Sequence, residues 1–204
     1  MPPIIILFFI VFSDKFREPI EAVLSTFFLG FLLIFPAGIL NEYLIWSKEN
    51  PFDYIFLAGF TEESLKFLAL FFFIRKRIEF NEPMDAIVYG TLISLGFATY
   101  ENFEYVYVHN EILASLEVAQ LRSVTAIPMH AFCGVIMGYN FGLYSLNKTK
   151  KFLYMSIGIP IALHSFYNYI DNIILSFVLI IISLITCLYL HRKVVGEQKN
   201  KRQE

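Results

Sequence analysis

Long apolar runs alternate with short polar or charged breaks along the whole chain. A helix needs about 20 mostly apolar residues to cross roughly 30 Å of hydrocarbon. Six runs reach that length, and a seventh, at about 3–13, is too short to be a secure span. The six runs are 21–40, 52–74, 84–108, 123–146, 152–171 and 173–190.

These runs predict an all-α fold. Lipid supplies no hydrogen-bond partners, so a spanning backbone must satisfy its own polar groups, and the runs lack the two-residue alternation of barrel strands. We therefore expect a polytopic transmembrane helical bundle of six long spans plus a short N-terminal one. No repeat or long polar linker interrupts the sequence, which indicates a single integral-membrane domain over 1–204 that ends in a basic tail at 191–204.

The composition agrees with a membrane protein. Hydrophobic residues make up 57% of the chain and aromatic residues 18%, whereas soluble domains are about 45–50% apolar. The net charge is only −2 and the basic residues are scattered, so no nucleic-acid partner is expected and the lipid bilayer is the predicted partner. Cys133 and Cys187 both lie in apolar runs and suggest neither disulfides nor a zinc-binding spacing.

The positions of lysine and arginine predict the orientation in the cell membrane, because cytoplasmic connections carry an excess of them. Of the 16 in the chain, 13 lie in connections or termini on one side of the six-span topology. Only Lys48 and Arg122 fall on the opposite side, and Lys66 lies inside a span. The C-terminus is therefore predicted to be cytoplasmic, and the connections near 41–51, 109–122 and 171–172 to be outside.

Ionisable residues at similar depths on four spans are the main functional signal. At about 1.5 Å per helical residue, Glu62 lies about 15 Å below the outer end of its span, and Glu63 and Lys66 follow it. Each charge near the bilayer centre costs roughly 2.5–3.5 kcal/mol, so these groups should be paired or should face a wet cavity. Three further residues lie about seven residues from the outer ends of other spans. These are Glu101, His130 and His164.

Lys66 can neutralise only one of the two adjacent glutamates. Glu62 and Glu63 precede it by four and three residues, so both carboxylates can reach its ammonium on a helix. A purely structural ion pair is the alternative for these residues, but it leaves one carboxylate free. A packing role is equally open for each histidine alone, and Asn102 and Asn168 could simply join neighbouring helices by hydrogen bonds.

The chemistry that suits this set is hydrolysis. A buried carboxylate can take a proton from water, a second acid or a histidine can give a proton to the leaving amine, and His or Asn donors can hold the oxyanion. The same residues could instead bind zinc through His130, His164 and Glu62 or Glu101. Because no HExxH or comparable local signature is present, no cofactor is predicted to be required, and zinc is kept as the alternative.

Small residues mark where helices can approach closely. His130, Gly134 and Gly138 repeat every four residues along one helix face, which predicts a close helix contact beside the histidine. Pro160, one turn before His164, predicts a kink. A Cys133–His130 nucleophile pair is disfavoured, because a buried cysteine usually packs as a small apolar residue.

Four short motifs resemble the PrsW family of intramembrane proteases. The string EESLK (62–66) has the EExxK form of that family, and FATYEN (97–102) is similar to its FxxxEN motif. His130 and His164 match the two later single histidines of the family. The resemblance covers roughly 55–170 in the family's order.

The related type II CAAX prenyl endopeptidases and the wider CPBP group carry EExxxR and FxxxH at the first two motifs. Lys66 and Glu101 depart from that pattern, so prenylated substrates are not expected. The resemblance implies the helical core of a glutamic-type intramembrane endopeptidase that needs no cofactor. Its implied substrate is a membrane-anchored protein, and the family is associated with cutting a single-pass anti-sigma factor.

The resemblance also implies a role for each matched residue. Glu62 would activate the water and Glu101 would assist it. His164, with Asn168 on its face, would stabilise the oxyanion, and His130 would line the site. Glu63 and Lys66 would set the electrostatics of the first glutamate, and Asn102 would be a supporting residue.

Two functions of other classes are alternatives. In a proton-coupled transporter the buried acids and histidines would form a relay. In a non-catalytic membrane scaffold they would serve assembly. A relay predicts a polar file that reaches both faces, whereas the inner halves of the spans that carry Glu101, His130 and His164 are dominated by apolar and glycine residues. The transporter is therefore disfavoured.

Overall fold

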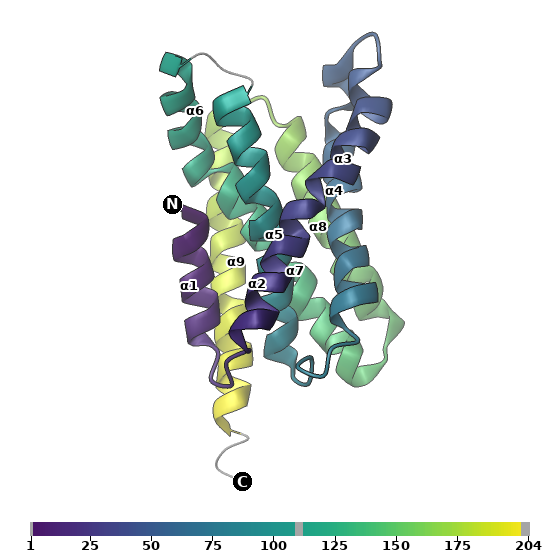
Figure 1. The fold of residues 1–204 in the computed structure, drawn as a ribbon, viewed down its shortest axis with the longest axis vertical. Helices are drawn as coiled ribbons and strands as arrows, with labels where there is room; N and C mark the ends of the chain where they lie inside the picture. The colour runs from purple at the N-terminus through teal and green to yellow at the C-terminus, as the bar shows by residue number, and fades with distance from the viewer. Residues whose placement is uncertain (1, 109–111, 201–204) are drawn as a thin grey trace.

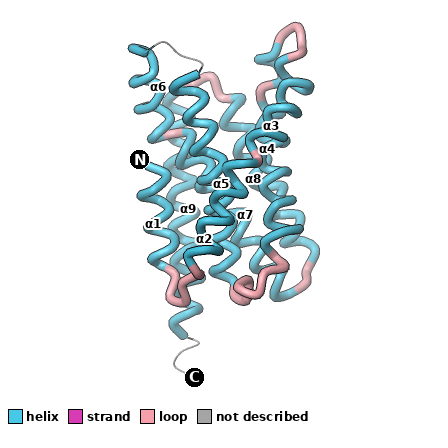
Figure 2. The backbone as a smooth tube through the Cα atoms, viewed as in Figure 1, coloured by secondary structure: helices cyan, strands magenta, loops and turns pink. Residues whose placement is uncertain are grey.

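Figure 1 shows the computed structural model of the chain, which describes residues 2–108 and 112–200. Every regular element in those two stretches is helical (Figure 2), as predicted. The α-helices, in chain order, are α1 (Pro2–Ser13), α2 (Ile20–Leu32), α3 (Ile34–Asn41), α4 (Phe56–Ala69), α5 (Pro83–Phe103), α6 (Ile112–Val124), α7 (Ala126–Asn147), α8 (Lys150–Tyr169) and α9 (Ile173–Asn200). Short π-helical turns extend α3, α4 and α5, and a 3-10 turn (Pro51–Tyr54) precedes α4.

The centre of the bundle is the contact between α5 and α7. Every residue of α5 from Met84 to Ala98 is buried, and α7 is buried without a break over 129–138. The two backbones nearly touch, since a Cβ added to Gly134 would lie 2.6 Å from the carbonyl oxygen of Gly90. Gly138, one turn later, is equally close to α5. The predicted stripe of small residues is therefore a close helix contact, and it fixes where His130 sits against α5.

The connections gather at the two ends of the bundle (Figure 2). The α1–α2, α4–α5 and α7–α8 connections and the C-terminal end of α9 lie at the lower end of Figure 1. This group contains the breaks rich in lysine and arginine. The helices therefore place these connections at one end, as the predicted topology requires. That this end faces the cytoplasm stays a prediction.

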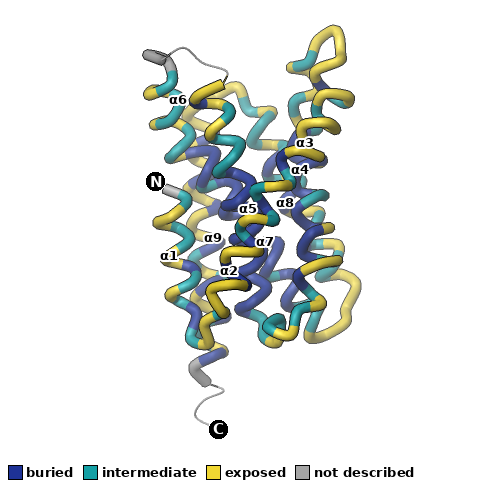
Figure 3. The backbone as a smooth tube through the Cα atoms, viewed as in Figure 1, coloured by how far each residue is buried: buried dark blue, intermediate teal, exposed yellow. Residues whose placement is uncertain are grey.

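The outer surface of the bundle is apolar. Three helices in the described residues are long and apolar enough to cross a membrane: Ile20–Trp46, Ser115–Asn147 and Ile173–Gln198. The first and the last bury only 28% and 22% of their most apolar stretch inside the protein, and exposed residues run along α2 and α9 while buried ones lie at the centre (Figure 3). Such a surface suits contact with lipid, so a polytopic membrane bundle is supported. The count of six long spans remains a prediction, because α4, α5 and α8 are not among these three helices.

Two segments that the sequence analysis placed outside the apolar spans are largely helical. The outer connection near 109–122 contains α6, whose residues Ala, Leu, Glu and Gln favour a helix although its polar side chains break the apolar pattern; residues 109–111 of that prediction lie outside the described residues. The basic tail predicted at 191–204 begins as a continuation of α9, which runs to Asn200. Residues 201–204 likewise lie outside the described part.

Candidate active site

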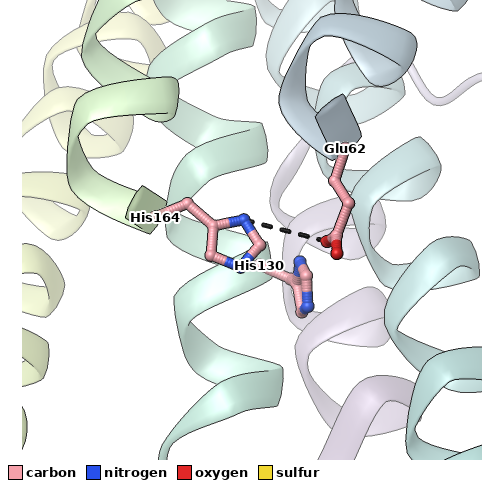
Figure 4. Close-up of side chains that lie close together, drawn as sticks. All are labelled: Glu62, His130 and His164. Carbon is pink, nitrogen blue, oxygen red and sulfur yellow. Dashed lines mark ion pairs between the residues drawn. The ribbon is translucent and has the colours of Figure 1, made fainter. Parts of the chain in front are cut away.

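Ionisable residues from four helices meet in one buried cluster. α4 contributes three of them, and α5, α7 and α8 contribute one each. Figure 4 shows three of the side chains converging from separate helices. The residues that the depth argument placed at a similar level thus lie close together. The six are Glu62, Glu63, Lys66, Glu101, His130 and His164.

Lys66 is paired with Glu63. Its Nζ lies 2.7 Å from Glu63 Oε1 but 3.9 Å from Glu62 Oε2. The side chains of Lys66 and Glu63 are both fully buried, where one charge without the other would be strongly disfavoured. The ring centroid of Phe97 lies 4.2 Å from the same ammonium and adds a cation–π contact. Lys66 therefore neutralises Glu63. The sequence alone left open which of the two glutamates it pairs with.

His130 lies between Lys66 and Glu101. Its Nδ1 is 2.8 Å from Lys66 Nζ, and its Nε2 is 2.8 Å from Glu101 Oε2. A lysine ammonium can only donate, so Nδ1 accepts from Lys66 and the ring proton lies on Nε2, which donates to Glu101. His130 is therefore a neutral ring with both nitrogens engaged. The ring of His164 packs edge-on against it, with 4.8 Å between centroids.

Arg122, near the C-terminal end of α6, contacts the same carboxylate oxygen of Glu101 as His130 does. It donates from Nη2 to Glu101 Oε2 at 2.8 Å and from Nε to Asn102 Oδ1 at 3.1 Å. Its guanidinium also lies 4.0 Å from the ring centroid of Tyr105. From the sequence, Arg122 counted only as a basic residue of an outer connection. The sequence did contain a signal for Arg122, because Arg122 and Lys48 are the only two basic residues on the predicted outer side.

Glu62 has the weakest set of partners in the cluster. Its Oε1 accepts from Asn41 Nδ2 at 3.4 Å, and its buried Oε2 has no hydrogen-bond partner among the described residues. His164 Nδ1 lies 3.9 Å from that oxygen, but the same nitrogen is closer to Glu63 Oε1, at 3.0 Å. Asn41, at the end of α3, was assigned to an outer connection from the sequence and was missed. Glu62 is thus a buried carboxylate with one oxygen free.

The charges of the site do not balance without a proton or a cation. Glu62, Glu63 and Glu101 are three carboxylates, and Lys66 and Arg122 are the two cations that the described salt bridges set against them. Lys66 serves Glu63 and Arg122 serves Glu101, so Glu62 is the carboxylate left over. A buried charge of this kind is stabilised when it takes up a proton or faces water or a cation.

A cavity of about 730 Å³ adjoins the side chain of Glu62. Its wall includes Glu62, Glu101, His130, His164 and Arg122, together with residues from α3 and the turn that follows it. Asn168, one turn after His164 on α8, lines the same cavity. The site is therefore an indentation within the bundle that presents Glu62 and His164 to a bound molecule.

The other candidate residues lie farther from the free carboxylate. Asn102 accepts from Arg122 and lines a separate apolar cavity, so it supports the arginine and does not face Glu62. The Cys133 thiol is fully buried and directed at the carbonyl oxygen of Pro160, 3.7 Å away. That position agrees with a packing cysteine.

The donor set also meets the first requirements of a zinc site. Glu62, His130 and His164 are all buried, and each offers one ligand atom within 4.8 Å of the other two. Two histidines and one glutamate are a common catalytic zinc set. Both histidines also contact second carboxylates, Glu101 and Glu63, as metal-bound histidines usually do. Lys66 would compete with such an ion, because its ammonium already donates to Nδ1 of His130.

Comparison with known proteins matches the chain over most of its length. The model of the family described as "PrsW family intramembrane metalloprotease" matches residues 18–191. The chain is 38% identical over 178 residues to Protease PrsW of Bacillus subtilis, covering 83% of this chain and 78% of that protein. It is 36% identical over 196 residues to Protease PrsW of Oceanobacillus iheyensis, covering 93% and 88%. No solved structure matches the chain.

Proposed function

The chain belongs to the PrsW family of intramembrane proteases, and we propose that Glu62 activates the water that cleaves the peptide bond. The observation that carries the proposal is Oε2 of Glu62, a buried carboxylate oxygen that has no hydrogen-bond partner among the described residues and belongs to a side chain of the cavity wall. Glu63 and Glu101 are each neutralised by a cation. Of the three glutamates, Glu62 is therefore the one able to accept a proton. Because the chain belongs to a protease family, the alternative functions of transporter and scaffold are not needed to explain the buried ionisable residues.

The proposed reaction has two steps, and the Glu62 carboxylate transfers a proton in both. Water bound beside Glu62 attacks the carbonyl carbon, forming a C–O bond, while its proton moves to Glu62 Oε2. The tetrahedral intermediate then collapses, the C–N bond breaks, and Glu62 returns the proton to the leaving nitrogen. The products are a carboxyl and an amino terminus, and Glu62 is again ionised.

We propose that the neighbouring residues stabilise the charges that develop during these steps. His164 donates Nδ1–H to Glu63, and in its doubly protonated form it would also donate Nε2–H to the oxyanion, with Asn168 on the same cavity wall. Lys66 keeps Glu63 ionised. Glu101 is engaged by both Arg122 and His130, so we propose that it positions His130 and does not itself take the proton from water.

A zinc-dependent version of the same hydrolysis is the second candidate. It is favoured by the short separations among Glu62, His130 and His164 and by the description of the matched family as metalloproteases. Those three residues would hold the ion, and a bound ion would polarise the substrate carbonyl and make water more acidic. Glu63 and Glu101 would then orient the two histidines through their ring nitrogens.

The substrate of an intramembrane protease is a membrane protein, and we propose a single-pass one. An anti-sigma factor is the class that the family resemblance suggests. The test is co-expression with a single-pass anti-sigma factor tagged at both ends, followed by cleavage in detergent with purified enzyme. Fragments that form with wild type but not with Glu62→Gln support the proposal, and identical fragments from both proteins overturn it.

Metal removal separates the two hydrolytic versions. We expect the purified wild-type protein to keep its cleavage rate after treatment with a strong chelator, because Glu62 can activate water without an ion. Elemental analysis of the same sample should then show less than stoichiometric zinc. Loss of cleavage on chelation, with recovery on addition of zinc alone, would establish the metal-dependent version in its place.

Replacing Arg122 by glutamine should lower the cleavage rate by about 10²-fold, because Glu101 and His130 move out of position. The effect on folding should be smaller, since the side chains of Arg122 and Glu101 are each 14% exposed and water can reach them. Without Arg122, Glu101 loses its cation and is drawn more strongly to His130, which shifts the histidine. The matched control is Arg192→Gln, since Arg192 is exposed on α9. An unchanged rate in Arg122→Gln would show that the α6 contact is only structural.

A further inference from the structure

The wall of the cavity beside Glu62 carries more negative than positive charge. Among the described residues that line it, four are glutamates and one is an arginine. The arginine already serves Glu101, to which it donates at 2.8 Å. A positively charged group that enters the cavity would therefore be attracted, and a negatively charged one repelled. The charged residues of the wall are Glu42, Glu62, Glu101, Glu104 and Arg122.

Glu42 lies in a π-helical turn directly after the residue that contacts Glu62. This turn, η1 (Glu42–Trp46), follows α3, and the backbone N–H of Ser47 donates to the carbonyl oxygen of Glu42 at 2.9 Å. Asn41, the last residue of α3, donates to Glu62 Oε1. Consecutive Cα atoms are about 3.8 Å apart, so η1 begins close to the reacting carboxylate. π-Helical turns are rare in proteins and occur often at functional sites.

The carboxylate of Glu42 has no cation of its own. Its side chain is exposed, and among the described residues no salt bridge within 4.0 Å involves it. The nearest basic residue along the chain, Lys48, lies over the ring of Tyr43, 5.6 Å from its centroid. An exposed glutamate without a partner is ordinary, so this feature alone identifies no ligand.

Trp46 is a second and independent sign of a positively charged ligand. It lines the same cavity and is 46% exposed. It lies four residues after Glu42, so the two side chains share one face of the turn. Within the described part of the chain, no lysine or arginine lies over its indole. Tryptophan binds a cation over its face more strongly than the other aromatic residues do.

We propose that Glu42 and Trp46 form a subsite that binds a lysine or arginine side chain of the substrate close to the bond that is cleaved. The carboxylate would pair with the charged group, and the indole would lie against that group and its apolar stem. Neither residue would take part in the chemistry, so the subsite acts on binding. The inference rests on the proposed function, because it takes this cavity as the place where the peptide is cut.

Such a subsite would distinguish the substrate from other single-pass proteins. The connection near 41–51, which contains η1, is predicted to lie outside the membrane. Basic residues are scarce on that side of membrane proteins, because they accumulate in cytoplasmic connections. A lysine or arginine next to the outer end of a membrane span is therefore an uncommon feature, and one that a protease can recognise.

Charge reversal on both molecules tests the subsite. The probe is the doubly tagged single-pass anti-sigma factor, made in three versions that carry lysine, glutamine or glutamate at the outer end of its span. We expect wild type to cleave the lysine version with the lowest KM. Glu42→Lys should raise the KM for that version by at least about tenfold, because like charges then meet, and should reverse the preference in favour of the glutamate version. The kcat should change little, since only binding is altered.

Two further variants separate the subsite from general effects. Glu49→Lys makes the same charge change at an exposed glutamate between α3 and α4 outside the cavity wall, and it should keep the wild-type preference. Trp46→Leu should reduce the preference for lysine over glutamine by about two- to fivefold. An equal rise in KM for all three versions would make Trp46 a membrane anchor and remove it from the subsite. Unchanged KM values in Glu42→Lys, or the same shift in Glu49→Lys, overturn the subsite.

Binding to Glu62→Gln protein separates failure of the subsite from failure of the proposed function. The affinity of this variant for each labelled version of the probe can be measured in detergent without any need for cleavage. Tighter binding of the lysine version, lost in the double variant Glu62→Gln with Glu42→Lys, supports the subsite whether or not Glu62 is the base. Equal affinity for the three versions overturns the subsite, and cleavage by wild type would then leave the proposed function standing.

Discussion

Glu62→Gln should reduce the rate of peptide-bond cleavage by about 10²–10⁴-fold, the range that a general base usually contributes. Glutamine keeps the size of the side chain and its hydrogen bond to Asn41, but it cannot take a proton from water. The measurement is the rate of fragment formation from a doubly tagged single-pass substrate in detergent. Glu49→Gln, at an exposed glutamate between α3 and α4, should cut at the wild-type rate.

The same variant should remain folded, and this separates loss of chemistry from loss of structure. Oε2 of Glu62 has no hydrogen-bond partner among the described residues, so a neutral amide in its place removes an uncompensated buried charge. The temperature of thermal unfolding should therefore stay equal or rise. Cleavage at the wild-type rate by folded Glu62→Gln protein would rule out Glu62 as the base.

Lys66→Met should lower the free energy of unfolding by about 3–5 kcal/mol, because it leaves a buried carboxylate without its cation. Lys66 contacts Glu63 at 2.7 Å and His130 at 2.8 Å, with no exposed side-chain surface. Unfolding can be followed with a thiol-reactive dye, since the two cysteines of the chain, Cys133 and Cys187, are both buried. Lys48→Met, at an exposed lysine, is the control and should unfold as wild type does.

The double variant Lys66→Met with Glu63→Gln should recover part of the lost stability. The glutamine removes the charge that the single variant left unpaired, which is the energetic test of a specific pair. Cleavage should remain low in the double variant, because His130 and His164 both lose a charged partner. If the second substitution restored no stability, the destabilisation would come from lost packing of the lysine stem and not from the ion pair.

The helical nature of the protein and the identity of the clustered residues could both be predicted from the sequence. Runs of about 20 apolar residues have few alternatives in lipid. Charges inside such runs are costly, so Glu62, Glu63 and Lys66 had to face partners or a cavity. Counting residues from the predicted ends then placed Glu101, His130 and His164 at a similar depth, because a helix advances by a fixed rise per residue.

The partners outside the apolar runs could not be predicted in the same way. Arg122 and Asn41 lie in segments that were interpreted as connections, and both reach into the site. α6 is a helix without a continuous apolar run, since Glu117, Gln120 and Arg122 interrupt its pattern. Hydropathy finds the segments that face lipid, and it says little about a helix whose polar side is turned toward a polar cavity.

The sequence by itself determined an all-α membrane protein, the set of acidic and basic residues that its helices must bury, and a resemblance to one family of proteases. Only the tertiary structure decided how those residues are paired. Lys66 is within reach of two glutamates along one helix. His130 on α7 contacts Lys66 and His164 on α8 contacts Glu63, and these contacts favour the Lys66–Glu63 pair. Pairing inside the bundle depends on distances between helices, which no periodicity along the chain encodes, and that is why Glu62 emerges as the free carboxylate only when the helices are packed.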